Sequence, residues 1–256
     1  MQQSPMFAPE SDWSIPEIFP KFADNERIAV DLETYDPHLL TSGPGWATNR
    51  GHIVGVGVAT KDWKGYFPIR HEGGGNLDEA VVLRWVKNTL SSTKREVIFH
   101  NALYDVGWLR REGVDVKGKI LDTMFAAPIV DENRYSYSLD SLGHLYCGEK
   151  KDESLLQDAA LAWGINPKSE MYKLNSKYVG PYGEQDAALT LKLYEKLKLE
   201  IQEQNLEQIY DLECSLIPLL IEMRWRGVRV DEEKADQISK DLSLKEQKLL
   251  VEIKRK

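Results

Sequence analysis

The 256-residue sequence contains only two cysteines, Cys147 and Cys214, and no apolar run of membrane-spanning length. Neither cysteine lies in a Cys-x-x-Cys pattern, which disfavours both a disulfide framework and a thiolate zinc site. The segment from Met1 to Pro20 lacks a basic flank followed by an apolar stretch, so it does not resemble a signal peptide. These absences favour a soluble protein in a reducing compartment, which we expect to be the cytoplasm.

An excess of basic charge is also absent. Lys and Arg number 33 against 41 Asp and Glu, which gives a net charge of −8. Proteins that bind nucleic-acid phosphates usually present a basic face, so this balance counts mildly against a nucleic-acid ligand. The objection is weaker for a nuclease that uses metals, because divalent ions in an acidic pocket reverse the local sign of charge where the phosphate lies.

Hydrophobic residues make up 42% of the chain, which is enough for one substantial core with helix left over for a second small unit. We expect an N-terminal tail over residues 1–26 that lies over the domain. A main domain should follow over residues 27–205. Residues 206–256 should form a separate helical segment.

Strand patterns dominate the first half of the main domain. Short runs rich in β-branched residues predict strands at 27–34, 52–60 and 65–69, joined as an antiparallel meander. Two more strands follow at 96–99 and 119–122. Helical patterns fall near residues 76–90, 102–111, 123–130, 138–146, 154–163, 183–205, 206–225 and from 231 onward. This order predicts an α/β fold with a sheet flanked by helices.

Glycine and proline give further detail around the first strands. The stretch Tyr35–Arg50 contains several of them and predicts a loop. In the second strand, valines on one face alternate with Gly55 and Gly57, which leave the other face bare for close packing. Asn76 is the expected N-cap of the helix that follows the third strand.

An Asp-x-Glu pair, Asp31 and Glu33, stands near the end of the first expected strand. Residues two apart on a strand point to the same side, so both carboxylates face one spot. They repel each other there unless cations lie between them, which makes the arrangement costly without metal. A turn-capping aspartate beside a solvated edge glutamate is the commoner explanation of an isolated pair of this kind.

Asn101 and Asp105 lie four residues apart at the start of a helix that follows a strand, so they share a helix face. A helix cap explains Asn101 well, whereas a first-turn acid favoured by the helix dipole explains Asp105 only partly. The neighbours of Asp105 include Tyr104 and Trp108, which indicates an acid close to a packed layer.

Tyr182 and Asp186 have the same spacing, which stacks a phenol one turn above a carboxylate. Ala187 and Ala188 follow the acid, and such small residues would let the helix approach the sheet closely. Taken alone, the pair is explained more simply as a surface tyrosine and a helix-start aspartate.

Taken together and in this order, the three segments resemble the DEDD exonuclease superfamily in its tyrosine-bearing branch. The closest resemblance is to the proofreading domain of family A DNA polymerases of a phage type. The matching motifs are Asp31-Leu-Glu33-Thr34, His100-Asn101-Ala-Leu-Tyr-Asp105 and Tyr182-Gly-Glu-Gln-Asp186. The histidine-bearing branch requires His where this chain has Pro181. Asp122, in Leu121-Asp-Thr-Met124, also lies in a segment resembling the family, and we expect it to be structural.

The resemblance implies a ribonuclease H-like mixed sheet and two-metal hydrolysis of phosphodiester bonds with Mg²⁺ or Mn²⁺. Asp31, Glu33 and Asp186 would hold the first ion, and Asp31 with Asp105 the second. Tyr182 would orient the attacking water, since a phenol with an ordinary pKa of about 10 is a poor base at neutral pH. These five residues are the expected catalytic set.

The substrate implied by the resemblance is a single-stranded or frayed DNA 3′ end. Thr34 and Asn101 would contact the terminal nucleotide. Leu39 or Leu40 would wedge against the terminal base, although a loop anchor in the core explains them as well. Three lysines could meet phosphates or lie in a solvated loop: Lys168, Lys173 and Lys177.

The segment Glu213–Asp231 resembles the junction that leads into a family A polymerase thumb, with Asp231 as the cap of the next helix. No palm or finger motif follows it. We therefore expect a polymerase domain as partner, missing in cis or present in trans, in a bacterial cell or phage-infected host. The last two helices should expose apolar faces.

Three alternatives remain open at this stage. An exoribonuclease of the same fold would carry the same motifs. A catalytically silent module would bind a primer end or a polymerase, although the presence of all four carboxylates and the tyrosine argues against it. A structural cation site in an unrelated α/β protein would need the acids for stability alone.

Overall fold

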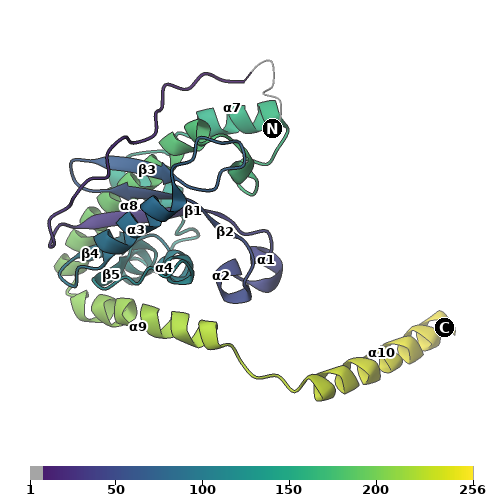
Figure 1. The fold of residues 1–256 in the computed structure, drawn as a ribbon. Coiled ribbons are helices and arrows are strands. Elements are labelled where there is room, and N and C mark those ends of the chain that lie inside the picture. The colour runs from purple at the N-terminus through teal and green to yellow at the C-terminus, as the bar shows by residue number, and fades with distance from the viewer. Residues whose placement is uncertain (1–7, 256) are drawn as a thin grey trace. The chain divides into compact units, whose positions relative to one another are not determined.

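The computed structural model describes residues 8–255 (Figure 1). The chain divides into two compact units, one ending at Ile221 and the other beginning at Glu222. The first unit contains a five-stranded sheet with helices on both faces. Within residues 8–255, no helix combines the length and hydropathy that a bilayer crossing requires.

The sheet has the strand order β3-β2-β1-β4-β5. The strands are β1 (Ile28–Tyr35), β2 (His52–Ala59), β3 (Lys64–Pro68), β4 (Glu96–Phe99) and β5 (Lys119–Asp122). β1, β2 and β3 form an antiparallel meander, whereas β1, β4 and β5 run parallel. This mixed sheet is ribonuclease H-like, so the expected fold class is confirmed.

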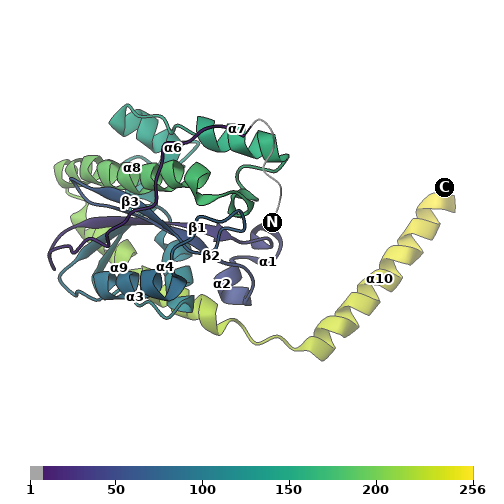
Figure 2. The same cartoon turned by 45° about the horizontal axis from the view of Figure 1, so that its top comes forward.

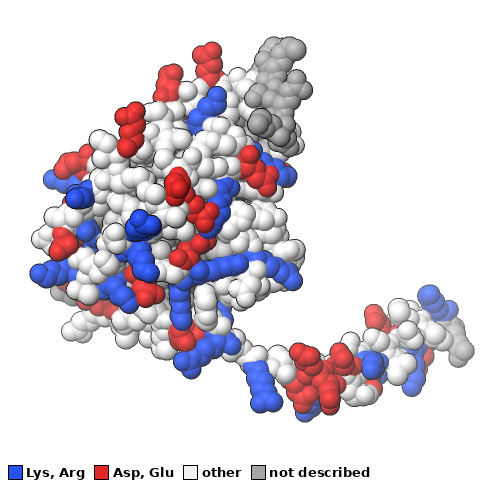
Figure 3. Space-filling model, viewed as in Figure 1, with Lys and Arg blue, Asp and Glu red and all other residues white. Residues whose placement is uncertain are grey.

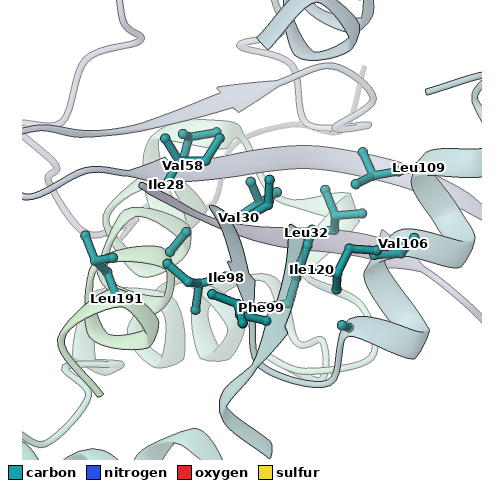
Figure 4. Close-up of a cluster of buried hydrophobic side chains, with 14 of the residues drawn as sticks. Ile28, Val30, Leu32, Val58, Ile98, Phe99, Val106, Leu109, Ile120 and Leu191 are labelled. Carbon is teal, nitrogen blue, oxygen red and sulfur yellow. The ribbon is translucent and has the colours of Figure 1, made fainter. Parts of the chain in front are cut away.

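The central strand β1 has two chemically different faces. Ile28, Val30 and Leu32 belong to the main hydrophobic core, among side chains from β4 and the helix after it (Figure 4). Asp31 and Glu33 point to the opposite face, because side chains alternate along a strand. The apolar residues therefore anchor the strand that presents the acidic pair.

Helices cover both faces of the sheet (Figure 2). On one face lies α8 (Ser176–Glu203), with α6 (Leu139–Leu142) and α7 (Ser154–Trp163) beyond it. On the other lie α3 (Glu79–Leu90) and α4 (Ala102–Arg111). The remaining helical elements are α1 (Leu39–Ser42), α2 (Gly45–Thr48), α5 (Thr123–Val130), a π-helical turn (Gly143–Cys147), a 3₁₀ turn (Met171–Lys173), α9 (Glu207–Arg226) and α10 (Glu232–Arg255).

The segment 8–26 packs over the first unit without forming a helix or strand. Phe19 stacks on Phe67 of β3 with ring centroids 5.3 Å apart. Phe22 packs beside Trp63 and Trp85. The segment therefore lies against β3, which is an edge strand of the sheet, and edge strands need such protection from unwanted pairing.

Tyr35–Arg50 is not a plain loop as predicted, because it contains the short helices α1 and α2. Asp36 organises it, since its Oδ2 accepts hydrogen bonds from the Gly45 backbone N–H at 2.9 Å and the Tyr104 hydroxyl at 3.1 Å. The second of these contacts spans 68 residues of sequence, so local propensity did not reveal it.

The predicted cap of α3 was wrong. Asp78 is the N-cap and accepts a hydrogen bond from the Val81 N–H at 3.0 Å. Asn76 is occupied elsewhere, because its side chain bonds both the N–H and the carbonyl of His71. The Asn76 amide therefore fixes the turn at His71, and Asp78, two residues later, takes the cap position.

In the unit from Glu222 onward, the predicted cap of α10 is confirmed. Asp231 Oδ1 accepts a hydrogen bond from the Lys234 N–H at 3.0 Å. Several apolar side chains of α10 are exposed, among them Ile238, Leu242, Leu249 and Ile253.

Candidate active site

Two glycines of β2 stand opposite the two acids of β1. The strand register pairs Asp31 with Gly57 and Glu33 with Gly55. Directly opposed residues in an antiparallel pair point to the same face, so each acid faces a position without a side chain. The pattern leaves room above this face that larger residues would fill.

The helix α8 packs closely against the sheet at Gly57. A Cβ at Gly57 would lie 2.5 Å from the carbonyl oxygen of Gly183, so the helix backbone rests almost directly on the strand. A Cβ at Gly55 would lie 2.0 Å from the Tyr66 hydroxyl. The predicted close packing at these glycines is confirmed, and it brings the turn of α8 between Tyr182 and Asp186 down to the acids.

Three of the four predicted carboxylates meet at one point. One oxygen each from Asp31, Glu33 and Asp186 lies within 4.8 Å of the others. Glu33 and Asp186 are buried and Asp31 is half-buried. The three come from β1 and α8, which are more than a hundred residues apart in sequence but in contact across the sheet face.

Asp105 lies beside this cluster but not in it. It is buried, 4% exposed, and its Oδ1 accepts a hydrogen bond from the Leu32 backbone N–H at 3.1 Å. That N–H is available because β4 pairs with β1 only at Ile28 and Ala29. The sequence-based expectation of an acid close to a packed layer is confirmed.

The carboxylates resist ionisation in the absence of a cation. Burial, reinforced by the charge of Asp186, raises the pKa of Asp31 to about 7. Burial and then the charge of Asp31 raise the pKa of Glu33 and that of Asp105 well above their usual values. A divalent ion would replace the retained protons, because metal ligands must be deprotonated.

Tyr182 and Lys151 complete the cluster. The Lys151 ammonium lies 2.5 Å from Asp186 Oδ2 and donates a hydrogen bond to the Tyr182 hydroxyl oxygen at 2.9 Å. Burial, followed by the charges of Glu33 and Asp186, raises the pKa of Tyr182 far above its usual value. The phenol therefore keeps its proton near neutral pH.

Sequence reasoning missed Lys151. It stands in the charged run from Glu149 to Asp152, which reads as a solvated loop and carries no local signal of burial. In the structure its side chain is only 9% exposed, with the ammonium 4.3 Å from the centroid of the Tyr182 ring. Only the fold brings this loop to α8, so no spacing within the loop could have identified it.

The prediction that Asp122 is structural is confirmed. It is fully buried, and its carboxylate accepts hydrogen bonds from the backbone N–H groups of Asn101, Ala102 and Met124 at 3.0, 2.7 and 2.8 Å. These bonds satisfy the first donors of α4 and α5, which an uncapped helix leaves open. Asp122 thus fixes the helix that carries Asp105.

Replacing Asp122 with alanine should cost roughly 4 kcal/mol of stability, because three amide donors would lose a charged acceptor in the interior. We expect the melting temperature to fall by about 10 °C. Thermal unfolding checks this, with Asp115→Ala as the control, since Asp115 is exposed and pairs with the exposed Lys117. An Asp122→Ala loss no larger than that of the control would contradict the structural role.

The simpler explanation of Asn101, a side-chain cap of α4, does not hold. Its φ of 77° is left-handed and its side chain makes no capping bond to α4, whose amides Asp122 satisfies instead. A left-handed backbone is costly for residues other than glycine and is tolerated best by Asn and Asp. The side chain is exposed next to the helix start.

The other predicted substrate contacts lie near the carboxyl end of β1. The Thr34 hydroxyl is 2.7 Å from the Tyr104 hydroxyl, so it is already engaged. On α1, Leu39 is 41% exposed and Leu40 is 99% exposed, so neither is a core anchor. Lys173 is paired with Glu170, and Lys177 lies over the Tyr178 ring.

Surface charge is mixed, not uniformly negative. Basic and acidic side chains alternate over the visible face of the first unit, and a band of Lys and Arg crosses the area of α4 and α2 (Figure 3). The formal net charge of −8 also counts acids gathered in the interior: Glu33, Asp105, Asp122 and Asp186.

The cluster fits a hard divalent cation. Oδ1 of Asp186 is buried and accepts no hydrogen bond from the residues the structure describes. Its neighbours include the carboxylates of Asp31 and Glu33, and the single charge of Lys151 offsets only part of their mutual repulsion, since the pKa values of both stay raised. Carboxylate oxygens alone are the donor set that Mg²⁺ and Mn²⁺ prefer.

A family model described as 3′-5′ exonuclease, of the DNA polymerase A type, matches residues 15–202. A DNA-directed DNA polymerase of Pseudomonas phage M6 is 36% identical over 98% of this chain and 39% of its own length. DNA polymerase I of Pseudomonas aeruginosa is 27% identical over 82% of this chain and 23% of its own length. The chain therefore spans less than half the length of these relatives.

Solved structures share the fold at low identity. Brucella melitensis NrnC superposes with a TM-score of 0.58 at 13% identity, over 79% of this chain and 86% of that one. The POL domain of Pol1 from M. smegmatis, in complex with DNA primer-template and dNTP, gives 0.58 at 16% identity, over 85% and 31%. Escherichia coli RNase D gives 0.52 at 15% identity, over 79% and 46%.

Proposed function

Because this chain belongs to the family of 3′-5′ exonuclease domains of DNA polymerase A, we propose that it hydrolyses single-stranded or frayed DNA from the 3′ end by a two-metal mechanism. One observation carries the proposal: the carboxylates of Asp31, Glu33 and Asp186 converge beside Tyr182 at one point of the sheet. We assign the activity to residues 27–205, and its role to proofreading during DNA replication.

The exonuclease fold implies divalent metal ions, and we propose Mg²⁺ or Mn²⁺. Asp31, Glu33 and Asp186 would hold one ion, and Asp31 with Asp105 the other. When bound, the ions supply an activated water and stabilise charge on the attacking and leaving oxygens. The protein supplies the carboxylates in a fixed arrangement, since α8 packs onto Gly57 of β2, which pairs with Asp31 of β1.

Tyr182 orients the reacting water and does not act as a base. Its raised pKa keeps the phenol protonated, so it can donate a hydrogen bond. The Lys151 ammonium has only hydrogen-bond donors, so the Tyr182 phenol oxygen accepts from it. The phenol O–H is then left to donate to another acceptor. Lys151 thus fixes the phenol oxygen relative to Asp186.

The terminal nucleotide would be contacted by three residues near the acids in sequence: Thr34, Asn101 and Leu39. Asn101 supports this role best, because its strained backbone leaves its side chain exposed at the start of α4, the helix that carries Asp105, rather than in a helix cap. Leu39 and its neighbour Leu40 present apolar surface on α1, which suits contact with an unstacked base.

An exoribonuclease activity is the second candidate, because RNase D, named as an exoribonuclease involved in structured RNA processing, shares the fold. The DNA polymerase relatives favour DNA. We further propose that the site serves a polymerase domain, in cis or in trans, in the cytoplasm of a bacterial cell or phage-infected host. Residues 206–256 would lead toward that polymerase region.

The test is digestion of matched 5′-labelled DNA and RNA oligonucleotides, single-stranded or with a mismatched 3′ end, with Mg²⁺ or with chelator. We expect stepwise shortening of DNA from the 3′ end, abolished by chelator and slower on RNA. Faster digestion of RNA would favour the exoribonuclease, and binding without shortening would support a silent module.

A further inference from the structure

Pro181 interrupts the hydrogen bonding of α8 one residue before Tyr182. Proline has no N–H, so the carbonyl of Lys177, four residues earlier, loses its helical donor. An interior proline also tends to kink a helix. The turn that leads directly into Tyr182 and Asp186 therefore has a backbone carbonyl that needs a partner from outside the helix.

Ser11 supplies the missing bond. Its hydroxyl donates to the Lys177 carbonyl oxygen at 2.8 Å, across 166 residues of sequence. The same Ser11 oxygen accepts a hydrogen bond from the Trp13 backbone N–H at 3.3 Å. The hydroxyl is thus held in place by its own segment while it satisfies the carbonyl that Pro181 leaves open.

Trp13 holds the helix on both sides of the proline. Before it, the indole lies against Gly180, where a Cβ would come within 2.2 Å of the ring. After it, the indole N–H donates to Glu184 Oε1 at 2.8 Å. A side chain at Gly180 would displace the indole, so the glycine and the tryptophan form a matched pair.

Trp13 also packs near Tyr66, which lies beside the part of α8 that carries the site residues. The Trp13 and Tyr66 rings have centroids 6.3 Å apart, and Tyr66 fills the space beside Gly183. The Tyr66 hydroxyl is fixed by His71 Nε2 at 2.8 Å. Trp13 and Tyr182 both pack against the small apolar cluster that contains Tyr66.

We propose that Ser11 and Trp13, here called the clip, are positioning residues for the exonuclease site. By replacing the bond lost at Pro181, the clip keeps α8 regular and directs Tyr182 and Asp186 toward β1. This inference rests on the proposed function. Both residues precede residues 15–202, the segment that the family model matches. The extended segment that carries them crosses α8 in Figure 2.

The test uses the full chain with Ser11→Ala, Ser11→Thr and Trp13→Phe. Hydrogen–deuterium exchange in chelator measures the stability of the Tyr182–Asp186 turn and does not depend on activity. Catalysis is measured by kcat and KM on a 5′-labelled DNA oligonucleotide. We expect Ser11→Ala and Trp13→Phe to speed amide exchange in the Tyr182–Asp186 turn about fivefold. The value of kcat should fall about tenfold with KM changed less than about twofold. Ser11→Thr keeps the hydroxyl, so its amide exchange in the turn and its kcat should match those of the wild type.

Phe19→Leu is the matched control, because Phe19 lies in the same segment but packs on Phe67 and on Trp85 of α3, on the sheet face opposite α8. It should lower the melting temperature while leaving kcat and exchange in the turn unchanged. Wild-type kcat and exchange in the clip variants, or an equal loss of kcat in Phe19→Leu, would overturn the proposal. If the wild-type chain digests nothing, the proposed function fails, while the exchange measurement still decides whether the clip holds the turn.

Discussion

Asp31→Asn is expected to lower the rate of metal-dependent 3′ digestion by about 10³-fold or more, while the chain stays folded. Asp31 would contact both proposed ions, so its loss removes several kcal/mol of charge stabilisation at the reacting phosphate, and each 1.36 kcal/mol is tenfold in rate. The amide keeps the shape of the side chain, and alanine should have the same effect. Digestion of a 5′-labelled oligonucleotide in Mg²⁺ measures the rate.

The control for this variant is Asp62→Asn, an exposed acid on the turn between β2 and β3. It should digest at the wild-type rate. An Asp31→Asn chain that is folded and digests as fast as the control would show that the site has been assigned to the wrong residues.

The second large effect is on stability without metal. The pKa of Asp31 rises from 3.8 to about 7 on folding, so the folded chain binds more protons than the unfolded chain between those values. Where the folded state binds more protons, stability falls as pH rises. The metal-free chain should therefore lose stability from about pH 4 to about pH 7, and Glu33 and Asp105, whose pKa values are also raised, add to the loss.

Asp31→Asn removes one of the groups responsible, so its melting temperature in chelator should exceed the wild-type value at pH 8. We expect a gap of about 5 °C, which corresponds to about 2 kcal/mol in a domain of this size. The difference in melting temperature between the variant and the wild type should become smaller toward pH 5. Mn²⁺ at about 100 times its Kd should add about 2.7 kcal/mol to the wild type. A wild-type chain that grows more stable than the variant as pH rises would contradict the electrostatic account.

The strands and the acidic pair could be predicted because their patterns are local. Alternation along β1 separates Leu32 from Asp31 and Glu33, and a period of two reveals it directly. The bare face of β2 was visible for the same reason, since Gly55 and Gly57 alternate with valines. What the pattern could not show is what fills that face, which is the Tyr66 hydroxyl and the backbone at Gly183.

The start of α8 could not be predicted, for a definite reason. Pro181 indicates a helix beginning near residue 183, yet α8 begins at Ser176. The carbonyl that the proline leaves open is bonded by Ser11, which is 166 residues away from Lys177. Long-range partners of this kind leave no trace in local propensity.

The same limit applies within the site. Asp31, Glu33 and Asp186 were identifiable from motif order, but Lys151 was not, because its loop looks solvated in the sequence. For Asn101 the local pattern suggested a helix cap, but Asp122 satisfies the first amides of α4 and Asn101 does not, so its role as a substrate contact stays a prediction from the motif. Motifs identified the acids and Asp122, whereas only the fold identified Lys151.

The most direct test of the central claim is an anomalous-difference map of crystals of this chain grown with Mn²⁺ under conditions in which it digests DNA. We expect peaks between the carboxylates of Asp31, Glu33 and Asp186, with a second ion on the side of Asp105. A digestion-competent crystal with no manganese at these carboxylates would contradict the account.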